Sequence, residues 1–328
     1  MAKIHRMIVD ASNMLFRVHA INSKEEMGTP EEKAALSLHI GINTLWSIFK
    51  KHKPDHLVLA FEGTNNWRKT YTKSSECISG RTYKANRIVD KSKEAFYELI
   101  NDFKKLLEEH TSIVCLSGDK LEGDDVIAGY VQRFAKTDDN ITIISGDKDF
   151  VQLLKHPNVK LFDTDKGKER LHEDADYFIF EKCFRGDSGD NVMSAFPKLR
   201  STKIIKAYHD EYEFLQLMKS EWSVKNVDTN EDKTFKVQDL YLENKLLMDL
   251  EAQPDDIRDR IEVAIDECLA SQGKYSNFHF MGFCGKHGLK EIATKSTYYT
   301  DLFAINQRLA KRLSGIPQEK EIKSIIQF

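Results

Sequence analysis

Acidic residues recur at set places in the first 190 residues of the chain. The set comprises Asp10, Glu62, Glu122, Asp124, Asp125, Asp147, Asp149, Asp187 and Asp190. Neighbouring carboxylates repel each other by several kcal/mol at an effective dielectric constant of about 20, so a cluster of them needs protons or bound cations. Oxygen ligands with no histidine or cysteine nearby favour a hard ion such as Mg²⁺ or Mn²⁺, and the number of acids favours two ions.

Each acid also has a purely structural explanation. Asp124 and Asp125 could complement the N-terminus of a helix, and Asp187 or Asp190 could cap a turn. Taken together, however, the acids follow four consecutive apolar segments. Independent capping roles for the single residues do not explain why acids follow all four. We therefore favour one shared site.

The four apolar segments span 7–9, 57–61, 113–116 and 141–144. Each is short, rich in Val, Ile or Leu and bounded by polar residues, which is typical of buried parallel strands. Helical patterns separate them. Thr29, Pro30 and Glu32 predict a capped helix that Pro54 stops, and apolar residues at helical spacing predict another helix between 92 and 110.

This alternation predicts an α/β fold with a mostly parallel central sheet flanked by helices. The carboxyl ends of the strands share one edge of such a sheet, where ligands bind. After about residue 185 the pattern becomes mainly helical and more charged, without a Gly/Ser-rich linker. We therefore expect a core over 1–185 and a helical extension over 186–328.

The overall charge is nearly balanced, with 49 Lys and Arg against 52 Asp and Glu and a formal net charge of -3. That balance argues against a simple polycationic nucleic-acid binder. When the nine acids of the site are set aside, the remainder carries +6. An acidic pocket in a basic body suits a protein that binds both metal ions and nucleic acid.

Seven motifs, in order along the chain, resemble those of the phage 5'-to-3' exonuclease and flap endonuclease family, relatives of the 5' nuclease domain of bacterial DNA polymerase I. They are IVD at 8–10, AFE at 60–62, WR at 67–68, YKANR at 83–87, EGDD at 122–125, SGDKDF at 145–150 and GDSGDN at 186–191. A weaker likeness continues at 243–247 and 254–257.

The resemblance implies a Mg²⁺-dependent nuclease with two ions, for which Mn²⁺ substitutes. One ion would be held mainly by Asp10, Glu62, Glu122 and Asp124. The second would be supported, directly or through water, by Asp125, Asp147, Asp149, Asp187 and Asp190. The implied activity is hydrolysis of phosphodiester bonds that removes RNA primers and 5' flaps during phage DNA replication.

The resemblance also implies a helical arch over about 64–92, through which a 5' single-stranded end threads. Arg68 and Lys84 would be catalytic, since a cation can neutralise charge that develops on the phosphate. The implied nucleic-acid contacts of this region are Trp67, Arg68, Tyr83, Lys84 and Arg87, a mixture that suits phosphate contact and base stacking. The bland alternative for Lys84 is a solvated surface lysine.

Two departures from the family pattern stand out. Residues 72–80 look like extra length in the arch, and 192–199 lack the glycine-rich hairpin that usually holds duplex backbone. Ser201 could instead cap a helix whose N-terminus meets duplex phosphates. The basic residues of that region are Lys198, Arg200, Lys203 and Lys206; a solvated basic helix face is an equal alternative.

The expected substrates are branched or nicked DNA and RNA–DNA duplexes with a 5' end. The apolar residues at 322–328 could contact a sliding clamp or a single-strand-binding protein, or pack back onto the body. We expect the protein to be a monomer. We also expect it in the cytoplasm, which is the host's cytoplasm if the chain is phage-encoded, because its cysteines are scattered and no apolar leader or membrane span directs export.

Two other functions remain as alternatives. A structure-specific DNA-binding protein that has lost catalysis would keep the basic residues, although the acid set looks complete. An α/β phosphatase of the aspartyl-phosphate type needs Asp-x-Asp after the first strand, whereas the chain has Asp10, Ala11 and Ser12 there.

Overall fold

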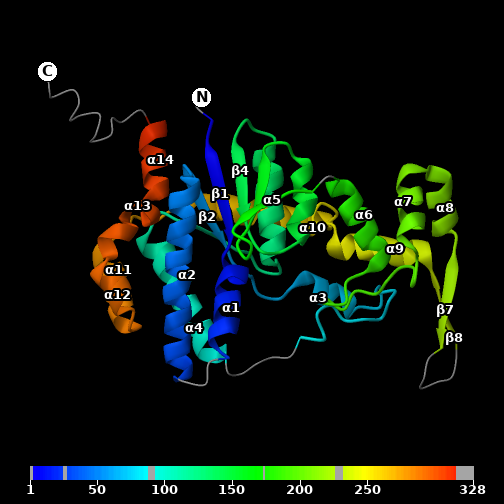
Figure 1. Cartoon of the computed structure of the whole chain (residues 1–328), viewed down its shortest axis with the longest axis horizontal. Helices are drawn as coiled ribbons and strands as arrows, with labels where there is room; N and C mark the ends of the chain where they lie inside the picture. The colour runs from blue at the N-terminus through cyan, green and yellow to red at the C-terminus, as the bar shows by residue number, and fades with distance from the viewer. Residues whose placement is uncertain (1–2, 25–27, 88–92, 173, 226–231, 315–328) are drawn as a thin grey trace.

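The structure, a computed structural model, describes residues 3–24, 28–87, 93–172, 174–225 and 232–314. A six-stranded sheet of order β3–β2–β1–β4–β5–β6 forms its centre (Figure 1). The parallel strands are β1 (His5–Asp10), β2 (His56–Ala60), β3 (Val114–Leu116), β4 (Asn140–Ile144) and β5 (Val159–Asp163), and β6 (Lys168–Arg170) is antiparallel. The predicted α/β class and all four predicted strands are confirmed.

The strand order reverses between β1 and β4, which lie side by side although the chain forms β2 and β3 between them. Met7 of β1 is in register with Leu57 of β2 on one side and with Thr142 of β4 on the other. Such a reversal opens a crevice beyond the carboxyl ends of the two neighbouring strands. The motifs that follow β1 and β4 therefore meet at one place.

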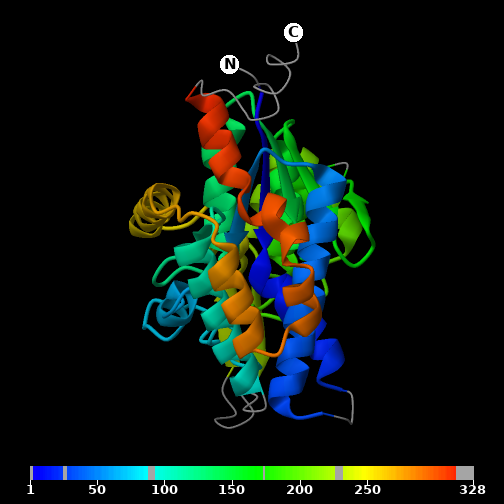
Figure 2. The ribbon, with the colours of Figure 1, turned by 90° about the vertical axis from the view of Figure 1, so that its left-hand side faces the viewer.

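Helices cover both faces of the sheet. Met7 and Val9 of β1 join one apolar cluster and Ile8 joins the other, because successive side chains of a strand point to opposite faces. The first face is covered by α1 (Ala11–Asn22), α2 (Pro30–His52), α4 (Glu94–His110), α11 (Asn277–Lys286), α12 (Lys290–Thr294), η3 (Ser296–Tyr299), α13 (Thr300–Phe303) and α14 (Ile305–Leu313), as Figure 2 shows. The second is covered by α5 (Gly123–Ala135), η2 (Asp149–Lys155) and α10 (Asp255–Ala270).

Both helices predicted in the first 110 residues are present. The capping box of α2 forms as expected, with the Thr29 side chain accepting from the Glu32 amide and the Glu32 side chain accepting from the Thr29 amide. Lys53 ends α2 in the left-handed conformation, just before Pro54. The apolar stripe of α4 is buried against the first face of the sheet.

The remaining elements form a lobe at the right of Figure 1 with an apolar cluster of its own. They are α6 (Ala175–Arg185), α7 (Ser201–His209), α8 (Glu211–Met218), the hairpin of β7 (Glu221–Lys225) and β8 (Asp232–Lys236), and α9 (Val237–Met248). The expected helical character holds except for the hairpin, whose mostly exposed, charged strands give no apolar signal. Phe184 and Leu199 share this cluster, so the packing crosses the division at residue 185, which stays a prediction.

The region of the expected arch, 64–92, is described up to residue 87. It contains one short helix, α3 (Trp67–Thr72), followed by turns. Residues 88–92 and the apolar segment 322–328 lie outside the described residues. Among the helices that the structure describes, none is long and apolar enough to cross a membrane.

Candidate metal centre and nucleic-acid site

Asp10 lies at the carboxyl end of β1, at the point where the strand order reverses. Its carboxylate accepts a hydrogen bond from the Asn13 amide at 2.9 Å, which caps α1, and another from Ser145 Oγ at 2.9 Å. The second bond ties β1 to the end of β4. Burial, with smaller contributions from Glu62 and Asp147, raises the pKa of Asp10 to about 7.

Glu62 follows β2 and joins that strand to two helix N-termini. Its amide donates to Ser12 Oγ at 3.0 Å, and its carboxylate accepts from the Gly123 amide at 3.1 Å. Desolvation by the surrounding protein and the neighbouring Glu122 carboxylate raise the pKa of Glu62, although the residue is partly exposed. Like Asp10, this acid is held in place through backbone contacts.

The N-terminus of α5 presents the third group of acids. Glu122 is its N-cap residue, and the Asp125 carboxylate accepts from the Glu122 amide at 2.9 Å. Burial, followed by the charges of Asp147 and Asp10, raises the pKa of Asp124 well above its ordinary value. The positive end of a helix dipole stabilises a carboxylate only in part. The helix N-terminus therefore does not fully compensate the negative charge of Asp124.

Arg68 of α3 lies beneath these acids. Its guanidinium contacts Asp125 through Nη1 and Nη2, at 2.9 and 2.7 Å, and Glu122 at 2.9 Å. Its Nε donates to the Leu247 carbonyl at 2.8 Å, and the residue is 1% exposed. Trp67, also buried, donates to Asp125 at 3.1 Å. Arg68, Trp67 and Asp125 thus form an internal network rather than a surface for substrate.

Lys84 lies between two acids of the site. Its ammonium donates to Glu122, and Asp190 Oδ2 lies 4.0 Å from it. Burial alone would lower the pKa of Lys84, but the charges of Glu122, Asp190 and Asp124 outweigh it and raise the pKa. Lys84 therefore stays a cation, and its side chain is only 10% exposed.

A second basic residue, Lys182 of α6, bridges Asp149 and Asp187, the latter at 3.0 Å. Burial alone would lower the pKa of Lys182, but the two acids raise it to about 12. Burial raises the pKa of Asp149. Burial alone would also raise the pKa of Asp187, but the Lys182 ammonium outweighs it and lowers that pKa. Asp147 precedes Asp149 and accepts from its amide at 2.9 Å. Sequence reasoning missed Lys182, which stands in no motif.

The other predicted nucleic-acid contacts in this region differ in exposure. Tyr83 is 5% exposed and donates to Asp190 at 2.9 Å, so its ring is not presented for base stacking. Arg87 pairs with Asp190 at 2.7 Å but keeps 61% of its side chain exposed. Of the predicted group, Arg87 is the best placed to meet a phosphate.

The basic residues around α7 are separate from the carboxylates, in the lobe at the right of Figure 1. Lys198, Arg200, Lys203 and Lys206 are all exposed, and Lys206 pairs with Glu213 at 2.7 Å. The prediction that Ser201 caps α7 is wrong. Arg200 is the N-cap residue, and Ser201 Oγ instead accepts from Arg185 at 2.7 Å.

The donor set fits Mg²⁺ in its chemistry, since it consists of carboxylates, and the surrounding protein raises the pKa values of Asp10, Glu62, Asp124 and Asp149. Across the described ranges, no three His, Cys, Asp or Glu side chains gather tightly enough to hold one ion as they stand. The cationic groups of Lys84 and Lys182 lie against the acids instead. The same negative charge that holds these two ammonium groups would hold divalent ions.

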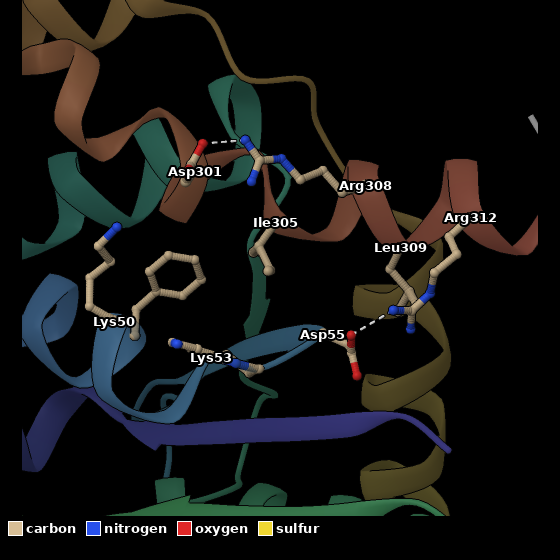
Figure 3. A pocket seen from close by; sticks show the side chains of 10 residues that line it. Lys50, Lys53, Asp55, Asp301, Ile305, Arg308, Leu309 and Arg312 are labelled. Atoms are coloured by element: carbon tan, nitrogen blue, oxygen red, sulfur yellow. Dashed lines mark hydrogen bonds and ion pairs between the residues drawn. The ribbon is translucent and has the colours of Figure 1, made fainter. Parts of the chain in front are cut away.

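A cavity of about 400 Å³ lies elsewhere, between the end of α2 and α14 (Figure 3). Asp55, which precedes β2, lines it, so the cavity is at the amino end of the strands and away from Glu62. Arg312 pairs with Asp55 at 2.7 Å and Arg308 pairs with Asp301. The cavity is therefore not part of the carboxylate site.

The sequence of this chain is similar to those of known 5'-to-3' exonucleases and related nucleases. A family model described as "5'-3' exonuclease, N-terminal resolvase-like domain" matches residues 5–183. Ribonuclease H of Enterobacteria phage T4 is 27% identical over 278 residues, covering 77% of this chain and 84% of that protein. Flap endonuclease Xni of Shewanella pealeana is 29% identical over 196 residues, covering 57% and 69%. DNA polymerase I of Rhizobium leguminosarum is 30% identical over 212 residues, but the matched region is 19% of the polymerase.

The fold is similar to that of the 5'-exonuclease of bacteriophage T5. One structure of it, with zinc bound, matches with a TM-score of 0.56 and 21% identity, covering 81% of this chain and 99% of that one. A T5 D15 protein co-crystallised with metal ions matches with a TM-score of 0.57 and 20% identity over the same shares. The match of the family model to more than half of the sequence shows that this chain belongs to the 5'-to-3' exonuclease family.

Proposed function

We propose that this member of the 5'-to-3' exonuclease family is a Mg²⁺-dependent enzyme that removes RNA primers and 5' flaps during phage DNA replication. One observation carries the proposal. Asp10 is buried and Asp124 is half-buried beside other acids at the reversal of strand order; neither has an ion pair within the described part of the chain, and both have raised pKa values. Such a group of acids is costly to keep unless cations bind to it.

The residues that would hold the ions divide into two groups. In the first group, Asp10 ends β1, Glu62 follows β2, and Glu122 and Asp124 lie at the N-terminus of α5. In the second, Asp149 and Asp187 contact Lys182, Asp190 lies near Lys84, and Asp147 accepts from the Asp149 amide. When bound, two divalent ions supply an activated water and stabilise charge on the leaving oxygen.

Lys84 and Arg68 have different parts in the proposal. Lys84 is the cation that we assign to the phosphate, because its ammonium already lies among the acids and remains protonated. Arg68 is assigned a positioning role, because it is 1% exposed and its donors face Asp125, Glu122 and Leu247. Asp125 shares that role, since both its oxygens already accept hydrogen bonds from Arg68.

The substrate class is also part of the proposal. Relatives carry the names ribonuclease H and flap endonuclease, and one T5 structure is a complex with DNA and metal ions. We assign branched or nicked DNA and RNA–DNA duplexes with a 5' end to this chain, with the exposed basic residues around α7 on the duplex. The protein would act as a monomer in the cytoplasm, and 322–328 would offer a contact for a sliding clamp or single-strand-binding protein.

The experiment that tests the assignment presents several substrates to one preparation. A labelled 5'-flap duplex, an RNA–DNA hybrid, a blunt duplex and p-nitrophenyl phosphate are incubated with Mg²⁺ and then with EDTA. We expect metal-dependent release of 5' products from the first two. Turnover of p-nitrophenyl phosphate alone would indicate a phosphatase, and retention of the flap duplex without cleavage would indicate an inactive binding protein.

A further inference from the structure

The segment 73–82, which follows α3, forms a loop closed at its base. The Tyr83 amide donates to Thr72 Oγ1 at 2.9 Å, and Thr72 Oγ1 donates to the Arg68 carbonyl at 2.7 Å. This loop coincides with the extra length noted in the sequence, and it leads directly into Lys84. Its position therefore bears on where the Lys84 ammonium lies.

Glu243 of α9 holds the far side of the loop. Its carboxylate accepts from the Ile78 amide at 2.5 Å and from the Ser79 amide at 3.1 Å. Glu243 is 3% exposed and forms no ion pair with any residue that the structure describes. A buried carboxylate is costly unless hydrogen bonds satisfy it, and bonds to a charged group contribute about 1.5–3 kcal/mol each. The two amides and Glu243 therefore stabilise each other.

The next residue of α9 holds the neighbouring loop. Asn244 donates to the carbonyls of Cys183 and Met193, both at 2.8 Å, and these residues flank the motif that contains Asp187 and Asp190. One turn of α9 thus anchors the two segments that carry Lys84 and Asp190.

The two anchored segments also bond to each other. The Lys84 amide donates to the Asp190 carbonyl at 2.8 Å, and the Asn191 side chain donates to the Thr82 carbonyl at 2.9 Å. Lys84 and Asn191 both have positive φ angles, of 56° and 60°. A residue other than glycine occupies this conformation at a cost of about 1–2 kcal/mol, so the surrounding contacts must fix it.

We propose that Glu243 is a positioning residue of the site: by holding the Ile78 and Ser79 amides, it fixes the path of the chain that delivers Lys84 to Glu122 and Asp190. The catalytic consequence rests on the proposed function, because it requires Lys84 to act in hydrolysis. The anchoring itself does not depend on any activity, so the two parts can be tested separately.

Glu243→Gln tests the anchoring. The amide side chain has nearly the same shape, but it has one acceptor oxygen where the carboxylate has two. We expect hydrogen exchange at the Ile78 and Ser79 amides to become about tenfold faster, the loss of about one hydrogen bond, while the amides of β1 are unchanged. Glu211→Gln, the same change at an exposed position of α8, is the matched control and leaves all of these rates unaltered. Wild-type exchange at 78–79 in Glu243→Gln would overturn the anchoring.

Single-turnover cleavage of a 5'-flap duplex tests the consequence. Glu243→Gln should cleave about 10- to 100-fold more slowly, because small displacements of a catalytic group are costly, with an unchanged dissociation constant for the duplex. In a Lys84→Ala background it should have no further effect. Multiplicative losses in the double variant would overturn the positioning role.

Two further outcomes remain distinguishable. If Glu243→Gln fails to melt cooperatively, Glu243→Asp, which keeps the charge but shortens the side chain, is taken through the same measurements and must show the same faster exchange and slower cleavage. If wild type does not cleave, the proposed function is overturned, whereas the exchange rates still decide whether Glu243 anchors the loop.

Discussion

Arg68 and Asp125 form a two-pronged ion pair inside the protein, with Nη1–Oδ2 and Nη2–Oδ1 distances of 2.9 and 2.7 Å. The side chains of the two residues are 2% and 0% exposed. Asp125 also accepts from the amide of Glu122, so the pair fixes the N-terminus of α5 on which the acids of the site stand. A substitution at this pair should therefore lower the free energy of unfolding of the protein, and should not remove a direct contact with substrate.

Replacing Arg68 with Met leaves the Asp125 carboxylate buried without its cation. Breaking a buried pair in this way costs about 3–5 kcal/mol, which should appear as a lower urea midpoint. Arg258→Met is the control, since its partner Asp255 is exposed, and it should change the free energy of unfolding by less than about 1 kcal/mol. Equal stability of Arg68→Met and wild type would contradict the internal role of this arginine.

Asp10 provides a prediction about charge and metal. Its pKa is 3.8 ordinarily and about 7 in the folded protein, so its contribution to stability is present at low pH and is lost as the pH rises from about 4 to 7. At pH 8 without metal, Asp10→Asn should be more stable than wild type by up to about 4 kcal/mol, because the folded protein raises the pKa of Asp10 from 3.8 to about 7.

Thermal melts at pH 5 and pH 8, with EDTA and with Mg²⁺, check this account of Asp10. Mg²⁺ should stabilise wild type at pH 8 and stabilise Asp10→Asn much less. An equal effect of Mg²⁺ on both proteins would show that Asp10 does not belong to the ion site.

Lys84 is expected to act on the chemical step. Its ammonium contacts Glu122 and lies near Asp190, and the removal of one group that stabilises developing charge typically lowers a rate by about 10²–10³-fold. Single-turnover cleavage by Lys84→Ala should show a loss of this size with little change in affinity for the duplex. Lys203→Ala, a change to an exposed lysine of α7, should by comparison alter affinity alone. A loss of affinity with an unchanged cleavage rate in Lys84→Ala would rule out a catalytic role.

The sequence was sufficient for the parts of the fold and site that depend on local pattern. The apolar segments around Met7, Leu57, Val114 and Ile143 are strands, and Asp10 and Glu62 stand at their carboxyl ends. By contrast, β5 and β6 were missed because β6 contains no apolar residue and β5 includes the exposed Lys160.

Contacts between distant segments could not be predicted in the same way. Ser145 donates a hydrogen bond to Asp10 only because β4 lies beside β1 in the sheet. No local sequence motif determines that strand order. Arg68 looked like a surface contact for nucleic acid, as charged residues are usually exposed. Its burial depends on Asp125 and on the Leu247 carbonyl, which comes from α9, far along the chain.

His56 of β2 gives a prediction that is independent of the site. The residue is 4% exposed, Tyr130 lies against its ring nitrogen at 3.1 Å, and burial with the nearby Arg6 lowers the pKa of His56 from 6.5 to about 3. Between these two pKa values, the unfolded chain therefore binds a proton at His56 and the folded protein does not. The free energy of unfolding should be highest above pH 6.5 and should fall as the pH decreases, by about 2 kcal/mol at pH 5.

Urea unfolding at pH 7.5 and pH 5 measures the effect of His56. His56→Asn keeps an acceptor for Tyr130 but cannot be protonated in this range, so its stability should depend less on pH by that amount. His209→Asn, at an exposed position of α7, should retain the wild-type pH dependence. Identical pH dependence in His56→Asn and wild type would refute the prediction.

In the mechanism that we propose, carboxylates at the reversal of strand order hold the ions needed to cleave nucleic acid. The initial rate of cleavage of a labelled 5'-flap duplex, measured against Mg²⁺ concentration for wild type and for Asp124→Asn, tests this role of the carboxylates. We predict that wild-type cleavage requires Mg²⁺ and stops with EDTA, whereas Asp124→Asn still binds the duplex but does not cleave it. Cleavage by wild type in EDTA, or by Asp124→Asn at the wild-type rate, would contradict the account.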